Sequence, residues 1–284
     1  YIKLVPLTPE QVGAIEKDRA QKNARVLVAT NDGNGLFYQG PTTREDLLEE
    51  VELYRHSDVG TVLYSFASGD TVNYPSKIGH RWGEGRRADD AITNDHRGVY
   101  ESLETLISKG IIPPRVIEEH VHQMGLKFHA MFRLALIGDL PPSDLLGDGL
   151  VRRRPDLRML AQDGTPMEKA SYAFPEVRDY MLSLIREVAE TFNIDGVNLG
   201  FTRGPQWVGY EAIVVEDFKK KHGKDLRHLD PNDLDVQRHR AGYINTFVRD
   251  ARRLVDDIGR KQGKKIELSA WPGSYGRLEC QLFF

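Results

Sequence analysis

Short apolar runs alternate along the chain with longer stretches in which apolar residues recur at helical spacing. Five runs have the length and composition of β-strands: residues 25–30, 61–66, 126–132, 195–202 and 266–270. The intervening stretches predict helices near residues 43–54, 99–108, 114–124, 175–192, 210–222 and 236–262. This alternation is typical of βαβ units, so the sequence predicts an α/β protein with a parallel sheet.

Apolar and polar side chains alternate within the predicted strands, although strands covered by helices on both faces are usually apolar throughout. Within residues 126–133, Phe128 and Phe132 share one face of the strand, whereas His129 and Arg133 share the other. Asn198 lies on the corresponding mixed face of residues 195–202. The polar members gather toward the C-terminal strand ends, where barrel enzymes keep their sites, which favours a (β/α)8 TIM-barrel type.

The number of strands and the chain length set the expected domain organisation. A closed barrel of this type has eight strands, and about five are visible here, so we expect a barrel that is incomplete at the C-terminus, or else an open sheet. The 284 residues suit one large domain. We expect an N-terminal extension over residues 1–23 and a barrel domain over residues 24–284.

Composition and charge exclude several classes of partner and site. The net charge is −3 without a long block of Lys or Arg, which argues against nucleic acid as a partner. No apolar run approaches the ~20 residues of a membrane span. The single cysteine, Cys280, excludes an intrachain disulfide. The chain starts at Tyr1 without a signal-peptide pattern, and the compartment and oligomeric state stay open.

Motifs of cofactor-dependent and nucleophile-dependent enzymes are missing from the sequence. No dinucleotide-binding glycine pattern, P-loop or Gly-x-Ser-x-Gly nucleophile elbow is present. The His-x-His pair, His120 and His122, lies in a predicted helix, where side chains at i and i+2 point apart. We therefore expect neither a metal nor an organic cofactor. A metal-dependent hydrolase is the least favoured of the functional hypotheses.

The segment after the fourth predicted strand carries the densest group of chemically useful side chains. Arg203, Trp207, Tyr210 and Glu211 follow one strand end, and aromatic rings with hydrogen-bonding side chains are what bind sugars. A partly buried Glu211 with a raised pKa could act as a general acid. Alternatively, Trp207 and Tyr210 pack against the next helix, and Glu211 is the exposed first-turn acid of that helix.

Two further groups of residues could face a ligand. The loop over residues 69–82 is long and carries Tyr74 and Trp82, which indicates a loop that covers the substrate; alternatively, both rings only anchor the loop. His129 and Arg133 face the barrel interior, and Trp271 at the end of the fifth strand offers a stacking surface. The alternatives are a hydrogen-bonded interior histidine and a tryptophan that caps the core.

The chain resembles the family-10-like glycosylhydrolases, barrel hydrolases of bacterial polysaccharide metabolism. The resemblance rests on Asp195-Gly196, the strand that follows and Arg203-x-Pro205, and it covers roughly residues 24–273. It implies hydrolysis of glycosidic bonds, a carbohydrate substrate and a secreted or periplasmic location. Many relatives carry a carboxylate inside this strand, where the present chain has Gly200. This departure shifts attention to Glu211 as the acid, or to a carboxylate in the strands that the expected incomplete barrel lacks.

Glycosidases usually use two carboxylates, and we expect Glu211 as proton donor with Asp32, at the end of the first strand, as the second. Asp32 also belongs to an Asn-Asp-Gly turn signal, and Asp70 is a weaker candidate. The side chains expected to bind the substrate are Asn31, Tyr74, Trp82, His129, Arg133, Asn198, Arg203, Trp207, Tyr210 and Trp271. The alternative function is a non-catalytic carbohydrate-binding barrel, because the strand carboxylate is missing.

Overall fold

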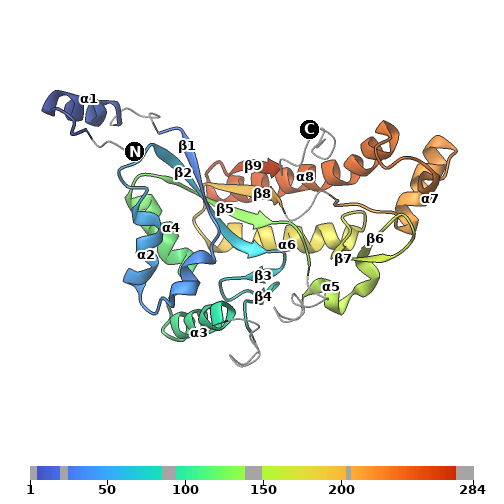
Figure 1. Ribbon diagram of the computed structural model, residues 1–284, viewed down its shortest axis with the longest axis horizontal. Coiled ribbons are helices and arrows are strands. Elements are labelled where there is room, and N and C mark those ends of the chain that lie inside the picture. The colour runs from blue at the N-terminus through green and yellow to red at the C-terminus, as the bar shows by residue number, and fades with distance from the viewer. Residues whose placement is uncertain (1–4, 20–24, 85–93, 138–148, 203–205, 273–284) are drawn as a thin grey trace.

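The computed structural model describes residues 5–19, 25–84, 94–137, 149–202 and 206–272, with a central sheet and helices along one side of it (Figure 1). The strands are β1 Leu27–Asn31, β2 Val59–Ser68, β3 Thr71–Val72, β4 His80–Arg81, β5 Lys127–Arg133, β6 Arg158–Leu160, β7 Pro166–Ala170, β8 Gly196–Phe201 and β9 Glu267–Pro272. The α-helices are α1 Pro9–Arg19, α2 Arg44–Glu52, α3 Asn94–Ser108, α4 Pro113–Gln123, α5 Leu150–Arg153, α6 Pro175–Thr191, α7 Ala212–His222 and α8 Leu234–Gln262. Short 3-10 helices are η1 Gly35–Gln39, η4 Pro155–Leu157 and η5 Leu226–His228.

All five predicted strands form one parallel sheet in chain order. β1 pairs with β2, β2 with β5, β5 with β8, and β8 with β9, every pair parallel. The small strands β3 and β4 extend the sheet beyond the end of β2. Within the described residues β1 and β9 each pair with a single strand, so the barrel is open between them. The fold is therefore α/β with a parallel sheet of the TIM-barrel type, and the predicted fold class is confirmed.

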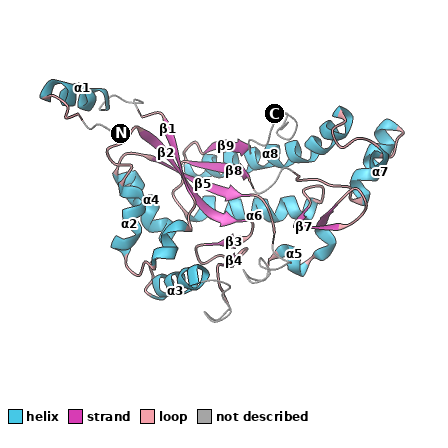
Figure 2. Cartoon of the chain, viewed as in Figure 1, coloured by secondary structure: helices cyan, strands magenta, loops and turns pink. Residues whose placement is uncertain are grey.

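One face of the sheet is apolar and covered by helices. Tyr64, Phe128 and Leu199 lie on this face and are fully buried. α4 contacts β2 and β5, and α8 contacts β9 and packs against α6 (Figure 2). The alternation of apolar residues along the strands therefore predicted correctly which face the helices cover.

The opposite face carries the mixed side chains in three rows across neighbouring strands. The rows, from the N-terminal to the C-terminal ends of the strands, are Leu63, His129, Gly196 and Glu267; Ser65, Met131, Asn198 and Ser269; and Arg133, Gly200 and Trp271. In a parallel sheet the carboxyl ends of all strands point to the same side, so the third row lies on the side where barrel enzymes bind ligands.

Local sequence signals set the helix starts. Thr43 accepts a hydrogen bond from the Asp46 N–H, and Asp46 accepts one from the Thr43 N–H, so the two form a capping box before α2. Pro113 and Pro175 open α4 and α6, where the missing proline N–H leaves no hydrogen bond unmade. These starts agree with the predicted ones to within two residues.

Besides the predicted loop over residues 69–82, which contains β3 and β4, two regions have more structure than the sequence predicted. Residues 136–172, predicted as a loop, include α5 and an antiparallel hairpin of β6 and β7. The hairpin strands are short and carry Pro166, Glu168 and Lys169, so they lack the apolar alternation of a recognisable strand. The expected N-terminal extension contains α1, an exposed helix. The predicted domain boundary at residue 24 stays a prediction.

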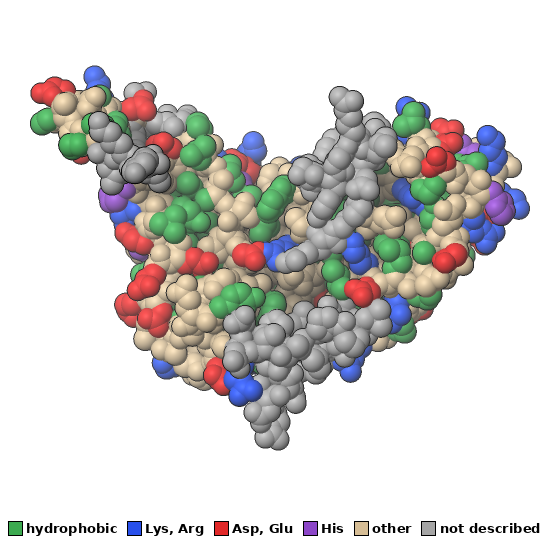
Figure 3. All heavy atoms as spheres, in the orientation of Figure 1, with side chains coloured by type: hydrophobic (Ala, Val, Ile, Leu, Met, Phe, Trp, Pro, Cys, Tyr) green, Lys and Arg blue, Asp and Glu red, His purple; other side chains and the backbone are tan. Residues whose placement is uncertain are grey.

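The space-filling view shows an outline that is indented between the arm carrying α1 and the part carrying α7 (Figure 3). Among the described helices, none combines the length and apolar character needed to cross a bilayer.

Candidate active site at the strand ends

A charged pair lies at the C-terminal ends of the strands. Asp32 directly follows β1, and its carboxylate forms an ion pair with the guanidinium of Arg133, the last residue of β5. The Asp32 side chain is 57% exposed, whereas that of Arg133 is 11% exposed. The structure thus brings together two residues that the sequence predicted for the site, and it leaves the carboxylate open to a ligand.

Gly200 separates Arg133 from Trp271 in the third row. Arg133 pairs with Gly200, and Gly200 pairs with Trp271, so two strand spacings, about 10 Å, separate the outer two. Gly200 has no side chain to fill the interval, and Trp271 is 43% exposed. The third row therefore has a gap in its side chains at the buried Gly200, with a guanidinium on one side and an indole on the other.

Asn198 supplies a polar group one row below this gap. Its Nδ2 donates a hydrogen bond to the Ser269 Oγ at 2.9 Å. Its Oδ1 is buried and accepts no hydrogen bond from the described residues. A buried amide oxygen without a donor is uncommon, so this atom is an unsatisfied acceptor on the mixed face.

His129 lies in the first row, away from the strand ends, and its ring covers Gly196. A Cβ at Gly196 would lie 2.5 Å from the ring, so glycine is needed there. The His129 Nε2 is 3.4 Å from a carboxylate oxygen of Glu267, which also binds the Lys127 ammonium at 2.6 Å. Burial lowers the pKa of His129, and the nearby Glu267 opposes this shift. His129 therefore belongs to the lower part of the interior, at the stability end of the barrel.

Glu211 is buried at the N-terminus of α7, and only 1% of its surface is exposed. Its Oε1 accepts a hydrogen bond from the Leu160 N–H at 2.8 Å, and the Gly209 N–H lies 3.1 Å from its Oε2. Burial raises the pKa of Glu211, while hydrogen bonds from Leu160 and Ser171 act against that rise. The carboxylate is thus neither the exposed first-turn acid of the alternative interpretation nor open to solvent.

The segment before α7 is joined to the β6–β7 hairpin by backbone hydrogen bonds. Leu160 accepts from the Tyr210 N–H at 2.9 Å and donates to Glu211, and Tyr172 donates to the Trp207 carbonyl at 2.9 Å. The connections that follow β5 and β8 therefore pack against each other at the same end of the sheet.

Trp207 and Tyr210 are largely occupied by protein contacts. The Trp207 ring packs edge-on against Phe201 and Tyr172, and the Lys169 Nζ lies 5.8 Å from its centre. The Arg240 guanidinium covers the Tyr210 ring at 4.3 Å. These contacts agree with the alternative in which both rings pack against neighbouring elements. Trp207 is nevertheless partly exposed. Arg203 lies outside the described residues.

Three side chains predicted to bind substrate are buried within the fold. The Tyr74 hydroxyl donates to Glu187 at 3.0 Å, and its ring packs against Phe66 and Phe192. Trp82 is 8% exposed, next to β4. Asn31 faces the helix side and accepts the Gly33 N–H at 2.8 Å, which closes the turn after β1. These contacts agree with the alternative in which the two rings anchor the loop, and Asn31 holds a turn; substrate binding at Asn31, Tyr74 and Trp82 stays a prediction.

Two carboxylates accept hydrogen bonds that hold loops in place. The sequence did not indicate Glu187, and it indicated Asp70 only as a weaker catalytic candidate. Glu187 on α6 accepts the Tyr74 hydroxyl and the Lys77 N–H, at 3.0 and 2.6 Å. Asp70 is buried and accepts the Leu150 N–H at 2.6 Å and the Tyr180 hydroxyl at 3.2 Å. Nothing adjacent in sequence distinguishes Glu187 from an exposed helical acid, because its partners lie more than 100 residues away.

The described residues contain no cluster of three or more histidine, cysteine or acidic side chains that could hold a metal ion. His120 and His122 on α4 bind different carboxylates, Glu52 at 2.6 Å and Asp195 at 2.8 Å. Asp195, which directly precedes β8, also accepts the Phe128 N–H at 2.8 Å.

Comparison with known proteins matches the chain to a glycosyl hydrolase-like family. A model of the family described as glycosyl hydrolase-like 10 matches residues 24–261. An S-layer-related protein of Niallia circulans is 30% identical over an alignment that covers 35% of this chain and 7% of that protein. The chain therefore spans only a small part of this relative.

Solved structures with a similar fold include two glycosidases. The α-L-fucosidase isoenzyme 2 of Paenibacillus thiaminolyticus aligns with 80% of this chain and 30% of its own, at 16% identity and a TM-score of 0.46. The β-galactosidase of the psychrophilic Marinomonas ef1 aligns with 86% of this chain and 37% of its own, at 12% identity and a TM-score of 0.49.

Proposed function

The chain belongs to the glycosyl hydrolase-like 10 family, and from that premise we propose that it binds a poly- or oligosaccharide at the C-terminal strand ends and hydrolyses a glycosidic bond there. The observation that carries the proposal is the third row of the mixed face. There the Asp32–Arg133 pair and the exposed Trp271 ring flank the gap above Gly200.

The proposed binding mode uses the chemistry of each flank. The indole of Trp271 stacks against the apolar face of a sugar ring, and Arg133 donates hydrogen bonds to its hydroxyl groups. The Oδ1 of Asn198, one row below, lacks a donor among the described residues and is the acceptor that we propose for a sugar hydroxyl. A neutral substrate can use all three groups without displacing the ion pair.

For catalysis, Asp32 is the better placed of the two predicted carboxylates. It is paired with the Arg133 guanidinium and exposed at the strand ends, where the second carboxylate of a glycosidase acts as a base or a nucleophile. Glu211 has the raised pKa of a proton donor, but its oxygens bind the amides of Leu160 and Gly209. Proton donation by Glu211 therefore requires the segment 209–211 to move.

The test is the release of reducing sugar from a panel of polysaccharides by the wild type and by Asp32→Asn, with Asp179→Asn, an exposed acid on α6, as the matched control. We expect at least a 100-fold loss of release in Asp32→Asn and no change in the control. Glu211→Gln is measured beside them, and full activity in that variant would exclude Glu211 as the acid. Release that is unchanged in Asp32→Asn would refute the catalytic role of Asp32.

A second candidate function is carbohydrate binding without hydrolysis. Two observations favour it: Gly200 provides no carboxylate at the centre of the gap, and the Glu211 carboxylate is sequestered by backbone amides. Retention of a polysaccharide without release of reducing sugar, in the wild type, would select this function over hydrolysis.

A further inference from the structure

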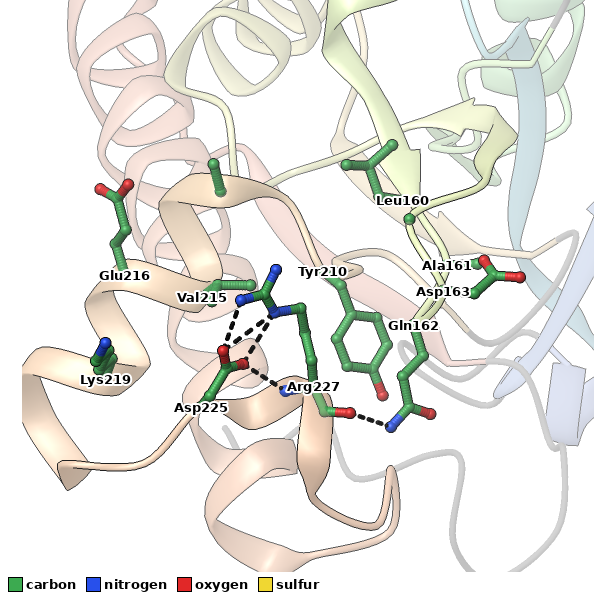
Figure 4. Close-up of a pocket in the computed structure, with 12 residues that line it drawn as sticks. Leu160, Ala161, Gln162, Asp163, Tyr210, Val215, Glu216, Lys219, Asp225 and Arg227 are labelled. Carbon is green, nitrogen blue, oxygen red and sulfur yellow. Dashed lines mark hydrogen bonds and ion pairs between the residues drawn. The ribbon is translucent and has the colours of Figure 1, made fainter.

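A separate cavity lies beside α7, away from the third row of the mixed face. It lies between the turn of the β6–β7 hairpin, residues 161–164, and the helices α7 and η5 (Figure 4). Its volume is about 410 Å³, which falls within the ~300–1,000 Å³ typical of small-molecule sites. None of the residues of the third row lines it.

Tyr210 provides the aromatic wall of this cavity. The Arg240 guanidinium lies over the ring and does not line the cavity, so the ring meets the cavity with its remaining surface. Tyr210 is 8% exposed, and its hydroxyl is buried without a hydrogen-bond partner in the described part of the chain. Because a buried hydroxyl loses free energy when it is unpaired, this group marks a position where a ligand oxygen is favoured.

The polar lining is rich in hydrogen-bonding groups but nearly balanced in charge. Asp225 and Arg227 form an ion pair at 2.6 Å, and Glu216 and Lys219 contribute one charge of each sign from α7 (Figure 4). Asp163 in the hairpin turn adds one negative charge. An ionic ligand would require an excess of one sign, so this lining suits a neutral ligand with many hydroxyl groups.

We propose that this cavity is a second carbohydrate-binding site, which holds a neutral sugar unit against Tyr210. The proposal rests on the proposed function, because it takes the ligand class from there. The sugar ring contacts the Tyr210 ring, one of its hydroxyl groups pairs with the Tyr210 hydroxyl, and others reach the charged side chains of α7 and η5. The site lies on the connections that follow β5 and β8, on the same side of the sheet as the third row.

The test separates the two sites by substitution. Ala212 is exposed at the start of α7 and lines the cavity, so Ala212→Trp fills the cavity without removing a hydrogen bond. Ala14→Trp on the exposed helix α1 is the matched control. Tyr210→Phe removes only the unpartnered hydroxyl. The probe is an oligosaccharide prepared from the polysaccharide that the wild type retains on a glycan array, with affinity measured by calorimetry in the wild type and in a Trp271→Ala background.

In the Trp271→Ala background, we expect residual oligosaccharide binding that Ala212→Trp weakens at least tenfold and Tyr210→Phe weakens several-fold, with no change in Ala14→Trp. Equal thermal midpoints exclude misfolding as the cause. Loss of all binding in Trp271→Ala alone, or residual binding that Ala212→Trp leaves intact, overturns the second site while the proposed function stands. Retention of no glycan by the wild type overturns both proposals.

Discussion

Arg133 at the end of β5 crosses β2 to form an ion pair with Asp32, the first residue after β1. The pair is asymmetric, because the Arg133 side chain is mostly buried and that of Asp32 is mostly exposed. The fold therefore depends on the two members to different degrees, and the exposed carboxylate can be replaced with little effect on packing.

Asp32→Asn is expected to lower the free energy of unfolding by less than about 1 kcal/mol, as for exposed ion pairs. Arg133→Met should lower it by more, since it removes a mostly buried side chain and all of its polar contacts. Urea denaturation of both variants measures the difference. Equal losses for the two would contradict the asymmetry of the pair.

Trp271→Ala should weaken carbohydrate binding at least tenfold, equivalent to about 1.4 kcal/mol, because the proposed stacking surface is lost. Tyr74→Phe should leave affinity unchanged and lower stability by about 0.5–1.5 kcal/mol, because it removes the hydrogen bond to Glu187. Calorimetric titration and thermal unfolding of both variants distinguish a ligand contact from a loop anchor. Weaker carbohydrate binding in Tyr74→Phe would indicate that Tyr74 contacts the ligand.

Gly200→Ala should place a methyl group in the gap between Arg133 and Trp271. The added Cβ lies 3.0 Å from the Phe132 carbonyl oxygen, so we expect a loss of about 1–3 kcal/mol in stability and weaker carbohydrate binding. Gly242→Ala on α8 is the control, since nothing lies within 4 Å of a Cβ there and helix propensity favours alanine. Unchanged binding in Gly200→Ala would place the ligand elsewhere.

The raised pKa of Glu211 predicts a pH dependence of stability. A carboxyl whose pKa is raised by folding contributes stability that is complete below its unfolded value of 4.5 and is lost as pH rises through the folded value. The Gln side chain in Glu211→Gln cannot ionise. The unfolding free energy of this variant, relative to that of the wild type, should therefore increase as pH rises from about 4. Chemical denaturation across this range measures the gain, and parallel curves would refute the assignment.

The lowered pKa of His129 predicts that the free energy of unfolding depends on pH below about 6.5. Its pKa is lowered by burial, so folding favours the neutral ring, and the stability it contributes is lost as pH falls below the unfolded value of 6.5. His129→Gln stays neutral, and its stability should therefore fall less than that of the wild type between pH 7 and pH 5. A steeper fall in the variant would indicate that the ion pair with Glu267 dominates.

The pattern was clearest in β5, β8 and β9, where apolar residues on one face alternate with mixed residues on the other. Phe128 and Phe132 alternate with His129 and Arg133, and that period fixed both the element and the face that helices cover. The hairpin of β6 and β7 was missed because its pairing depends on tertiary contacts, such as Ala170 with Leu136, and not on a local pattern.

Within the candidate site, sequence indicated the residues of the strand ends better than those of the loops. Asp32, Arg133 and Trp271 were predicted from their position relative to a strand end, and all three lie at the C-terminal ends of the parallel strands. Loop aromatics carry no period, so Tyr74 and Trp82 looked like ligand contacts although they are buried. Burial in a loop is decided by partners such as Glu187, which lies 113 residues from Tyr74.

Leu160 has both of its backbone groups bound to the segment that precedes α7, through Tyr210 and Glu211. The hairpin and this segment consequently form one unit for protein engineering. A chimera that takes the β6–β7 hairpin from another family member must take residues 206–211 with it, or leave the carboxylate of Glu211 without its donor. Variation in length is best placed in the exposed turn at 162–164, which lies outside these hydrogen bonds.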